Sequence, residues 1–233
     1  MRPIMSFRKL LALSTIFCFS ACYADNHRIT DVICSGNAAL FIDGKSASFS
    51  ETNKHNAVIE DGVMIISGGK VHTNLPRKLQ SISLHDNCQL RTKHWDGRIN
   101  TLVHNTSNDV VMDGFFSINK ILKTGQGRLV LYWLDGSNDL VAKIDSGKAY
   151  LAGQVKRLIL RTTGDSHFNG QHLISRRVLL KSIDQSTAQV HPLNALTVFS
   201  LDQSHVGYVR PVSYSNLSSS DQSSIVMEPF RQN

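Results

Sequence analysis

The chain has 233 residues, of which 41% are hydrophobic, and its formal net charge is +7. This apolar content is ordinary and allows one or two packed domains. Three positive charges lie in a predicted export signal that contains no acid, so the rest of the chain carries +7 − 3 = +4. A mildly basic exported protein argues against a nucleic-acid partner.

Residues 1–24 are predicted to be a secretory signal peptide. A basic start precedes an apolar stretch from Leu10 to Ala21, with small residues at its end. This stretch is too short to be identified as a membrane span. Two processing routes stay open: cleavage after Ala24, or lipidation of Cys22 in an imperfect lipobox in which Phe19 replaces the usual leucine. Either route places the protein in the periplasm, at the outer membrane or cell surface, or outside the cell.

Residues 25–78 are predicted to form an N-terminal cap of short β-strands. Their apolar residues alternate over short runs, which are separated by the turn signals Ser35-Gly36-Asn37, Asp43-Gly44, Asp61-Gly62 and Gly68-Gly69. Short strands between such turns are typical of β-hairpins or a small sheet. A stacked array needs a distinct first element to cover its open end, so we expect this region to cap the array that follows.

Residues 79–228 repeat one short pattern every 18–20 residues. Small or polar anchor residues stand at Cys88, Asn108, Gly127, Gly147, Ser166, Ser186, Ser204 and Ser223. Six positions before the anchors lie Ile82, Leu102, Ile121, Val141, Leu160, Leu180, Val198 and Leu217. Two positions after them lie Leu90, Val110, Leu129, Ala149, Phe168, Ala188, Val206 and Ile225. Such a fixed period means that each repeat buries its apolar face by stacking on its neighbours.

The repeats carry strand periodicity rather than helix periodicity. Apolar residues lie two apart after the anchors, as at Leu129 and Leu131 or at Ala188 and Val190. We therefore expect an all-β fold, a right-handed parallel β-helix of about eight coils whose neighbours lie ~4.8 Å apart. Residues 229–233 are predicted to be a disordered tail.

Two cysteines remain in the body of the chain, Cys34 and Cys88. A pair in an oxidising compartment indicates a disulfide, which on the chain-entropy model contributes roughly 4 kcal/mol at most. The alternative is two buried free thiols, since Cys88 is itself an anchor. No paired Cys/His spacing accompanies them, so they do not indicate a metal site.

The last three serine anchors each follow the dipeptide Asp-Gln, which places Asp184, Asp202 and Asp221 two positions before the serine. In stacked coils these carboxylates would lie about 5 Å apart. The favoured interpretation is an exposed corner in which aspartate caps backbone donors. The alternatives are a calcium strip and a carboxylate pair for glycoside hydrolysis.

A possible ligand-binding basic stripe follows three successive anchors by one position, at Arg128, Lys148 and His167. These side chains should point outward, where they would suit anionic glycans or lipopolysaccharide phosphates, although a solvated face explains them too. Trp95, Trp133, Tyr132 and Tyr150 offer a sugar platform, or core packing. The ten histidines form no metal-ligand spacing, and no catalytic triad can be read from the chain.

The sequence resembles the bacterial GIN domain family, described as the head domain of autotransporter adhesins. The resemblance covers residues 29–227 and rests on the strands from Asp31 to Ile66, the segment from Val71 to Leu84, the repeated Gly/Ser/Asp corners, and Val206–Pro211. Here Asp-Gln-Ser corners replace the Gly-Ser-Gly corners of the family. The resemblance implies an exported β-helical protein, in some members a lipoprotein, with no catalytic residue.

The sequence therefore predicts a non-enzymatic surface or envelope protein, without cofactor, that presents a long regular surface to a glycan or a protein. It predicts no transmembrane span in the mature chain and allows a lipid anchor. One alternative is a polysaccharide-active β-helical enzyme, by analogy of fold alone. Another is a structural envelope protein that binds another protein.

Overall fold

The structure is a computed structural model that describes residues 29–44, 57–136 and 138–229. The predicted signal peptide, both processing routes at Cys22 and Ala24, and residues 230–233 of the predicted tail lie outside the described residues. The described residues form strands and no helix, so they contain no helix long and apolar enough to cross a membrane.

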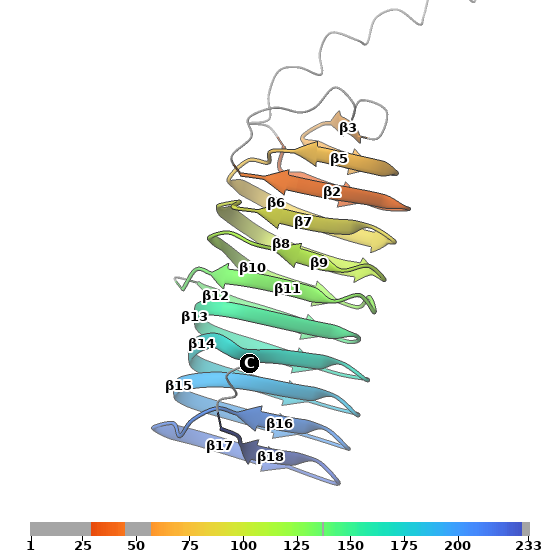
Figure 1. The fold of residues 1–233 in the computed structure, drawn as a ribbon. Coiled ribbons are helices and arrows are strands. Elements are labelled where there is room, and N and C mark those ends of the chain that lie inside the picture. The colour runs from red at the N-terminus through yellow and green to blue at the C-terminus, as the bar shows by residue number, and fades with distance from the viewer. Residues whose placement is uncertain (1–28, 45–56, 137, 230–233) are drawn as a thin grey trace, which may run out of the picture.

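The fold is a right-handed parallel β-solenoid, in which each coil gives one strand to each of two opposed faces (Figure 1). Face A contains β4 (Val63–Ile66), β1 (Asp31–Cys34), β6 (Lys78–Asp86), β8 (Gly97–Thr106), β10 (Phe116–Lys123) and β12 (Asp139–Ile144). Face B contains β5 (Gly69–Thr73), β2 (Ala38–Asp43), β7 (Gln89–Lys93), β9 (Val110–Met112) and β11 (Leu129–Leu134).

Three long strands bend from face B into face A: β13 (Lys148–Thr162), β14 (His167–Ser182) and β15 (Thr187–Ser200). The last strands are β17 (Tyr214–Ser219) on face A and β16 (His205–Tyr208) and β18 (Ser224–Met227) on face B. The predicted β-helix is therefore confirmed, with about seven turns instead of eight coils.

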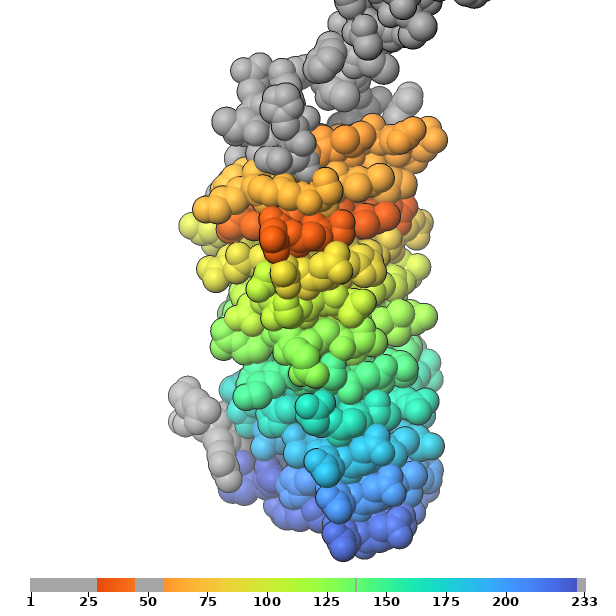
Figure 2. Space-filling view, turned by 90° about the vertical axis from the view of Figure 1, so that its right-hand side faces the viewer, coloured from red at the N-terminus to blue at the C-terminus, as the bar shows by residue number. Residues whose placement is uncertain are grey.

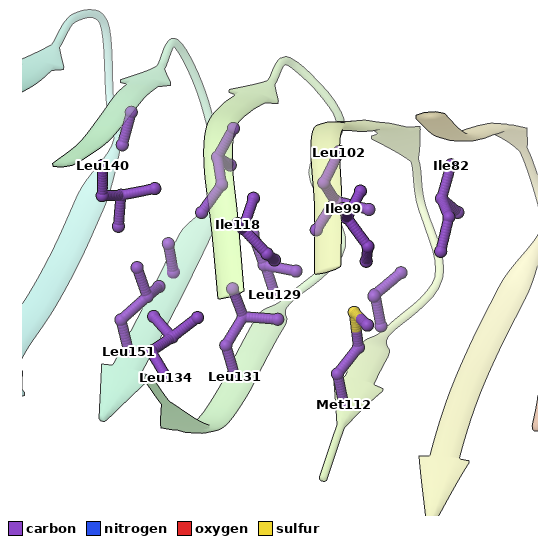
Figure 3. Packing of buried hydrophobic residues seen from close by; sticks show 14 of the residues in the cluster. Ile82, Ile99, Leu102, Met112, Ile118, Leu129, Leu131, Leu134, Leu140 and Leu151 are labelled. Carbon is purple, nitrogen blue, oxygen red and sulfur yellow. The ribbon is translucent and has the colours of Figure 1, made fainter. Parts of the chain in front are cut away.

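The apolar column after the anchors lies in register through the molecule. Leu90 pairs with Val110, Val110 with Leu129, and Leu129 with Ala149, and the pairing continues through Phe168, Ala188, Val206 and Ile225. The first seven of these side chains are fully buried. Figure 3 shows Leu129 and Leu131 of face B meeting Ile118 of face A in the core. Stacking thus merges the apolar faces of the coils into one core, as the period predicts.

The apolar residues six positions before the anchors form a second column, on face A, and one of its members was wrongly assigned from the sequence. Ile121 pairs with Ala142, and Val141 points outward with 41% of its surface exposed. The cause is a shorter corner. Ile144 is in register with Lys123, but the anchor Gly147 follows Ile144 by three positions, whereas Gly127 follows Lys123 by four. Gly147 adopts φ 67°, a left-handed conformation that lets the corner close early.

The N-terminal region forms one hairpin and two further coils, where several hairpins or a small separate sheet were expected. The hairpin joins β3 (Ala57–Glu60) to β4 through Asp61 and Gly62, both with positive φ. The two coils are interleaved, because β1 lies between β4 and β6 while β2 lies between β5 and β7. In Figure 2 the orange coil of β4 and β5 accordingly lies outside the red coil of β1 and β2. β3 then covers the outer edge of β4.

The predicted disulfide between Cys34 and Cys88 is confirmed. The two Cα atoms lie 5.9 Å apart and both side chains are fully buried. The bond ties the interleaved β1 to the corner that follows β6, and it closes a loop across a sequence separation of 54 residues. It therefore fastens the coil whose place in the stack departs from chain order.

A polar column runs inside the corner that follows face A. Towards the C-terminus it consists of hydroxyls, and Thr162 Oγ1 lies 2.9 Å from Ser182 Oγ, which lies 2.8 Å from Ser186 Oγ. Thr162, Ser182 and Ser186 therefore satisfy one another within a coil and between coils, as buried polar groups require.

Two ionisable groups occupy the same column further towards the N-terminus. His104 and Lys123 are Cα partners and have no exposed surface. The Lys123 amine donates to the Gly125 carbonyl and, over 3.0 Å, to the Ser146 carbonyl, while burial lowers its pKa to about 8. Burial is the main cause that lowers the pKa of His104 to about 4, and the nearby Lys123 charge adds to it. Polar backbone groups of His104 and Arg128 act in the opposite direction and raise the pKa in part. His104 is therefore neutral at pH 7.

Candidate functional site

The three aligned aspartates form corners of successive coils, and two of them accept hydrogen bonds from backbone N–H groups. Asp184, Asp202 and Asp221 have φ of 65°, 60° and 59°. The Asp184 carboxylate accepts a 2.9 Å hydrogen bond from the Gly164 N–H, and the Asp202 carboxylate accepts one of 3.4 Å from the Asp184 N–H. These contacts are those of a capped corner. Among the described residues, no group of three His, Cys, Asp or Glu side chains is placed to hold a metal ion.

The predicted basic stripe is brought together on face B, but most of its charge is compensated. Lys148 pairs with His167, and Arg128 lies beside Lys148 in the preceding coil. Arg128 Nε donates to Asp109 over 3.0 Å; this contact raises the pKa of Arg128 and lowers that of Asp109. Burial lowers the pKa of His167, whose Nδ1 lies 2.5 Å from Thr187 Oγ1. The stripe therefore offers less positive charge than its sequence indicates.

A larger basic surface covers the outer side of face A between β12 and β15. Lys143, Arg161 and Lys181 are Cα partners in successive strands, and Arg157 and Arg177 form a second row. Between the two rows lie Val141, Ile159 and Leu179, also partners in register. We call these eight residues, with the 42% exposed Phe199 next to Lys181, the basic-apolar surface.

Most of the basic-apolar surface, without Arg157 and Arg177, lines a shallow depression of about 540 Å³. Two exposed ion pairs lie at its β12 edge, Lys143 with Asp145 at 2.7 Å and Arg157 with Asp139 at 2.5 Å. Both ion pairs thus lie at one edge of the surface, while Arg161 and Lys181 extend the row of cations beyond that edge. Like charges ~4.8 Å apart repel by roughly 1 kcal/mol in water, so the row is favourable only where an anion or solvent screens it.

Sequence reasoning missed the basic-apolar surface because of the misassigned coil. Arg161 and Lys181 both stand five positions before an anchor, but Lys143 stands four before Gly147. The shortened corner at Gly147 therefore hid the continuous row. Allowing the period to change by one residue, as the 18–20 residue spacing invites, is the rule that would have revealed it.

A second depression, of about 720 Å³, lies on the outer side of face B near the N-terminal end. We call it the aromatic groove, and define it by Phe41, His72, Arg91, Lys93, Asp113, Tyr132 and Trp133. Of the four predicted platform residues, only Tyr132 and Trp133 belong to it. Trp95 is buried in the core, and Tyr150 is half-buried with its ring 6.1 Å from that of His167.

Solved structures share the fold of this chain. A putative lipid binding protein from Parabacteroides distasonis has a TM-score of 0.67 at 14% identity, over 84% of this chain and 91% of that one. A putative adhesin from Parabacteroides merdae has a TM-score of 0.64 at 14% identity, over 84% and 90%. A putative adhesin from Bacteroides fragilis has a TM-score of 0.53 at 12% identity, over 84% and 91%.

No family model matches the sequence, and no curated protein matches it. At 12–14% identity these structural likenesses establish the fold alone. The GIN family, to which the sequence is similar, remains a proposal.

Proposed function

We propose that the protein is an exported, non-enzymatic binding scaffold of the bacterial cell envelope, related to the GIN domain family, and that its basic-apolar surface docks on an anionic lipid surface. The observation that carries this proposal is the row of Lys143, Arg161 and Lys181 beside an apolar strip in which Val141 and Leu179 are exposed and Ile159 is half-buried. Clustered cations attract phosphate-bearing headgroups, and adjacent apolar side chains enter the boundary with the acyl chains.

The geometry suits a surface better than a deep pocket. The residues lie on the flat outer side of a rigid sheet, and the depression that they line is shallow and open. The names of the structural neighbours, adhesins and a lipid binding protein, support a surface-binding role of this kind. Residues 25–233, with the predicted signal peptide removed, are the form that we expect to act in the envelope.

The test is sedimentation of oxidised residues 25–233 with vesicles of phosphatidylglycerol and phosphatidylcholine, compared with phosphatidylcholine alone. We expect binding to the anionic vesicles only, and a loss of binding at 1 M salt, where the Debye length falls to about 3 Å. Each basic side chain near an anionic surface contributes about 1 kcal/mol, so Arg161→Glu with Lys181→Glu should weaken binding at least ten-fold.

A charge-matched control distinguishes a docking face from general attraction. Lys70→Glu with Lys148→Glu changes the net charge by the same amount, but both residues lie exposed on face B. We expect this control to bind nearly as the wild type does. Equal losses in the two variants, or equal binding to neutral vesicles, would contradict the proposal.

A further inference from the structure

The end of β11 projects two consecutive aromatic side chains into solvent. Along a regular strand, neighbouring side chains point to opposite faces. In β11, however, Leu131 and Leu134 are buried while Tyr132 and Trp133 between them are 45% and 60% exposed. The pairing of β11 with β13 shifts register between Leu131 and Leu134. This bulge turns outward the side chain of Trp133, which strict alternation would direct into the core.

The conformation of Trp133 is unfavourable. Its φ of 62° lies in the left-handed region, where glycine, asparagine and aspartate are at ease and a bulky aromatic residue is an outlier. Other corners of the solenoid use Gly147 or Asp184 in that conformation. A large indole kept exposed on a strained backbone, where glycine would satisfy the geometry, points to a function for its ring.

Further aromatic rings lie around it. The ring of Phe115, 70% exposed, lies 6.3 Å from that of Trp133, and the Phe115 N–H donates to Asp96 Oδ1 over 3.0 Å. At the other end of the aromatic groove, Phe41 and His72 stack with centroids 4.7 Å apart and planes inclined by 12°. The groove therefore has an aromatic wall at each end.

The floor between these walls is polar and balanced in charge. Arg91 and Lys93 supply donors, and Asp43 and Asp113 supply acceptors. Two bases face two acids, in contrast to the basic-apolar surface of face A. An apolar peptide seated here would remove these charged groups from water and offer them no hydrogen bonds in return, which is costly. A ligand with a C–H-rich face and many hydroxyl groups satisfies both the rings and the floor.

We infer that the aromatic groove is a binding site for a neutral oligosaccharide. A sugar ring stacks on Trp133, with Tyr132 beside it, while Arg91, Lys93 and Asp113 exchange hydrogen bonds with hydroxyl groups. The groove crosses the strands β5, β2, β7, β9 and β11, which at ~4.8 Å per strand gives a length of roughly 19 Å, enough for several sugar rings in a row.

The test is an array of neutral and acidic oligosaccharides probed with oxidised residues 25–233 at low and high salt, followed by titration of each hit in solution. The chain has two tryptophans, and since Trp95 is buried, a change in fluorescence on titration reports on Trp133. We expect neutral oligosaccharides to bind with affinities that change less than two-fold between the two salt concentrations, unlike the vesicle binding proposed above.

The decisive variant is Trp133→Gly. It removes the ring and relieves the backbone, so we expect at least a ten-fold loss of oligosaccharide affinity without any fall in the midpoint of thermal unfolding. Tyr214→Ala is the matched control, because Tyr214 is equally exposed on β17 of face A, and it should bind as the wild type does.

Three outcomes would overturn the inference: no neutral oligosaccharide binds, Trp133→Gly binds as tightly as the wild type, or Trp133→Gly converts a dimer into a monomer in sedimentation velocity. The last outcome would identify the groove as an interface between two copies of this chain. None of the three bears on the vesicle binding of face A.

Discussion

Replacing His104 with leucine removes an imidazole from the fully buried column of face A. Leu84 occupies the same column as the Cα partner of His104 and is itself fully buried, so leucine suits this environment. Neither ring nitrogen of His104 has a hydrogen-bond partner of good geometry. An unsatisfied buried polar group costs about 1–3 kcal/mol, so His104→Leu should raise the free energy of unfolding by about that amount at pH 7.5.

The stabilisation should grow in acid. The pKa of His104 falls from 6.5 to about 4 in the fold, so below pH 6.5 the unfolded chain takes up a proton that the folded chain does not. The wild type therefore loses stability as the pH falls from 6.5 to about 4, by about 3 kcal/mol in full, because one pKa unit corresponds to 1.36 kcal/mol. His104→Leu lacks this contribution.

Urea unfolding of both proteins at pH 7.5 and pH 4.5 measures the effect. His85→Leu is the control, because His85 belongs to the neighbouring strand β6 but is only half-buried. It should not raise the free energy of unfolding at pH 7.5, because a half-buried imidazole can hydrogen-bond to water. The reasoning fails if His104→Leu is less stable than the wild type at both pH values, or if its stability falls in acid as steeply.

Two further predictions concern the disulfide and the corners. Replacing both Cys34 and Cys88 with serine should lower the free energy of unfolding by roughly 4 kcal/mol at most, measured by urea unfolding against the oxidised wild type; an unchanged midpoint would mean that the bond does not constrain the unfolded chain. Asp184→Ala should lower it by about 1–2 kcal/mol, because alanine disfavours a φ of 65° and the Gly164 N–H loses its acceptor. Asp184→Gly keeps the backbone conformation and should lower the free energy of unfolding by less than Asp184→Ala does, as measured by urea unfolding of both variants. Equal losses would exclude backbone strain as a cause.

The stacked coils were predictable from sequence because one residue type recurs at one structural position. From Leu90 to Ile225 the column after the anchors holds its register, since each inward residue touches its counterparts in the neighbouring coils. The slip at Val141 shows the limit of this reasoning. A corner can shorten by one residue where Gly147 permits it. Counting back from that anchor then assigns inward positions to residues that point outward, and outward positions to residues that point inward.

The remaining features depend on contacts between distant residues. No local pattern shows that β1 enters the stack between β4 and β6, since the same alternating run would suit a separate hairpin. The bulge that exposes Trp133 leaves only Tyr132-Trp133 between two leucines as its trace in the sequence. The neutralisation of Arg128 was readable once the register was known, because Asp109 stands one position after the preceding anchor.

The most direct test of the account measures both kinds of binding on both surface variants. The account predicts a crossover: Arg161→Glu with Lys181→Glu loses the anionic vesicles and keeps the oligosaccharide, whereas Trp133→Gly loses the oligosaccharide and keeps the vesicles. If each variant lost both ligands in proportion, or neither, the solenoid would not be a scaffold with separate binding surfaces on its two opposite faces.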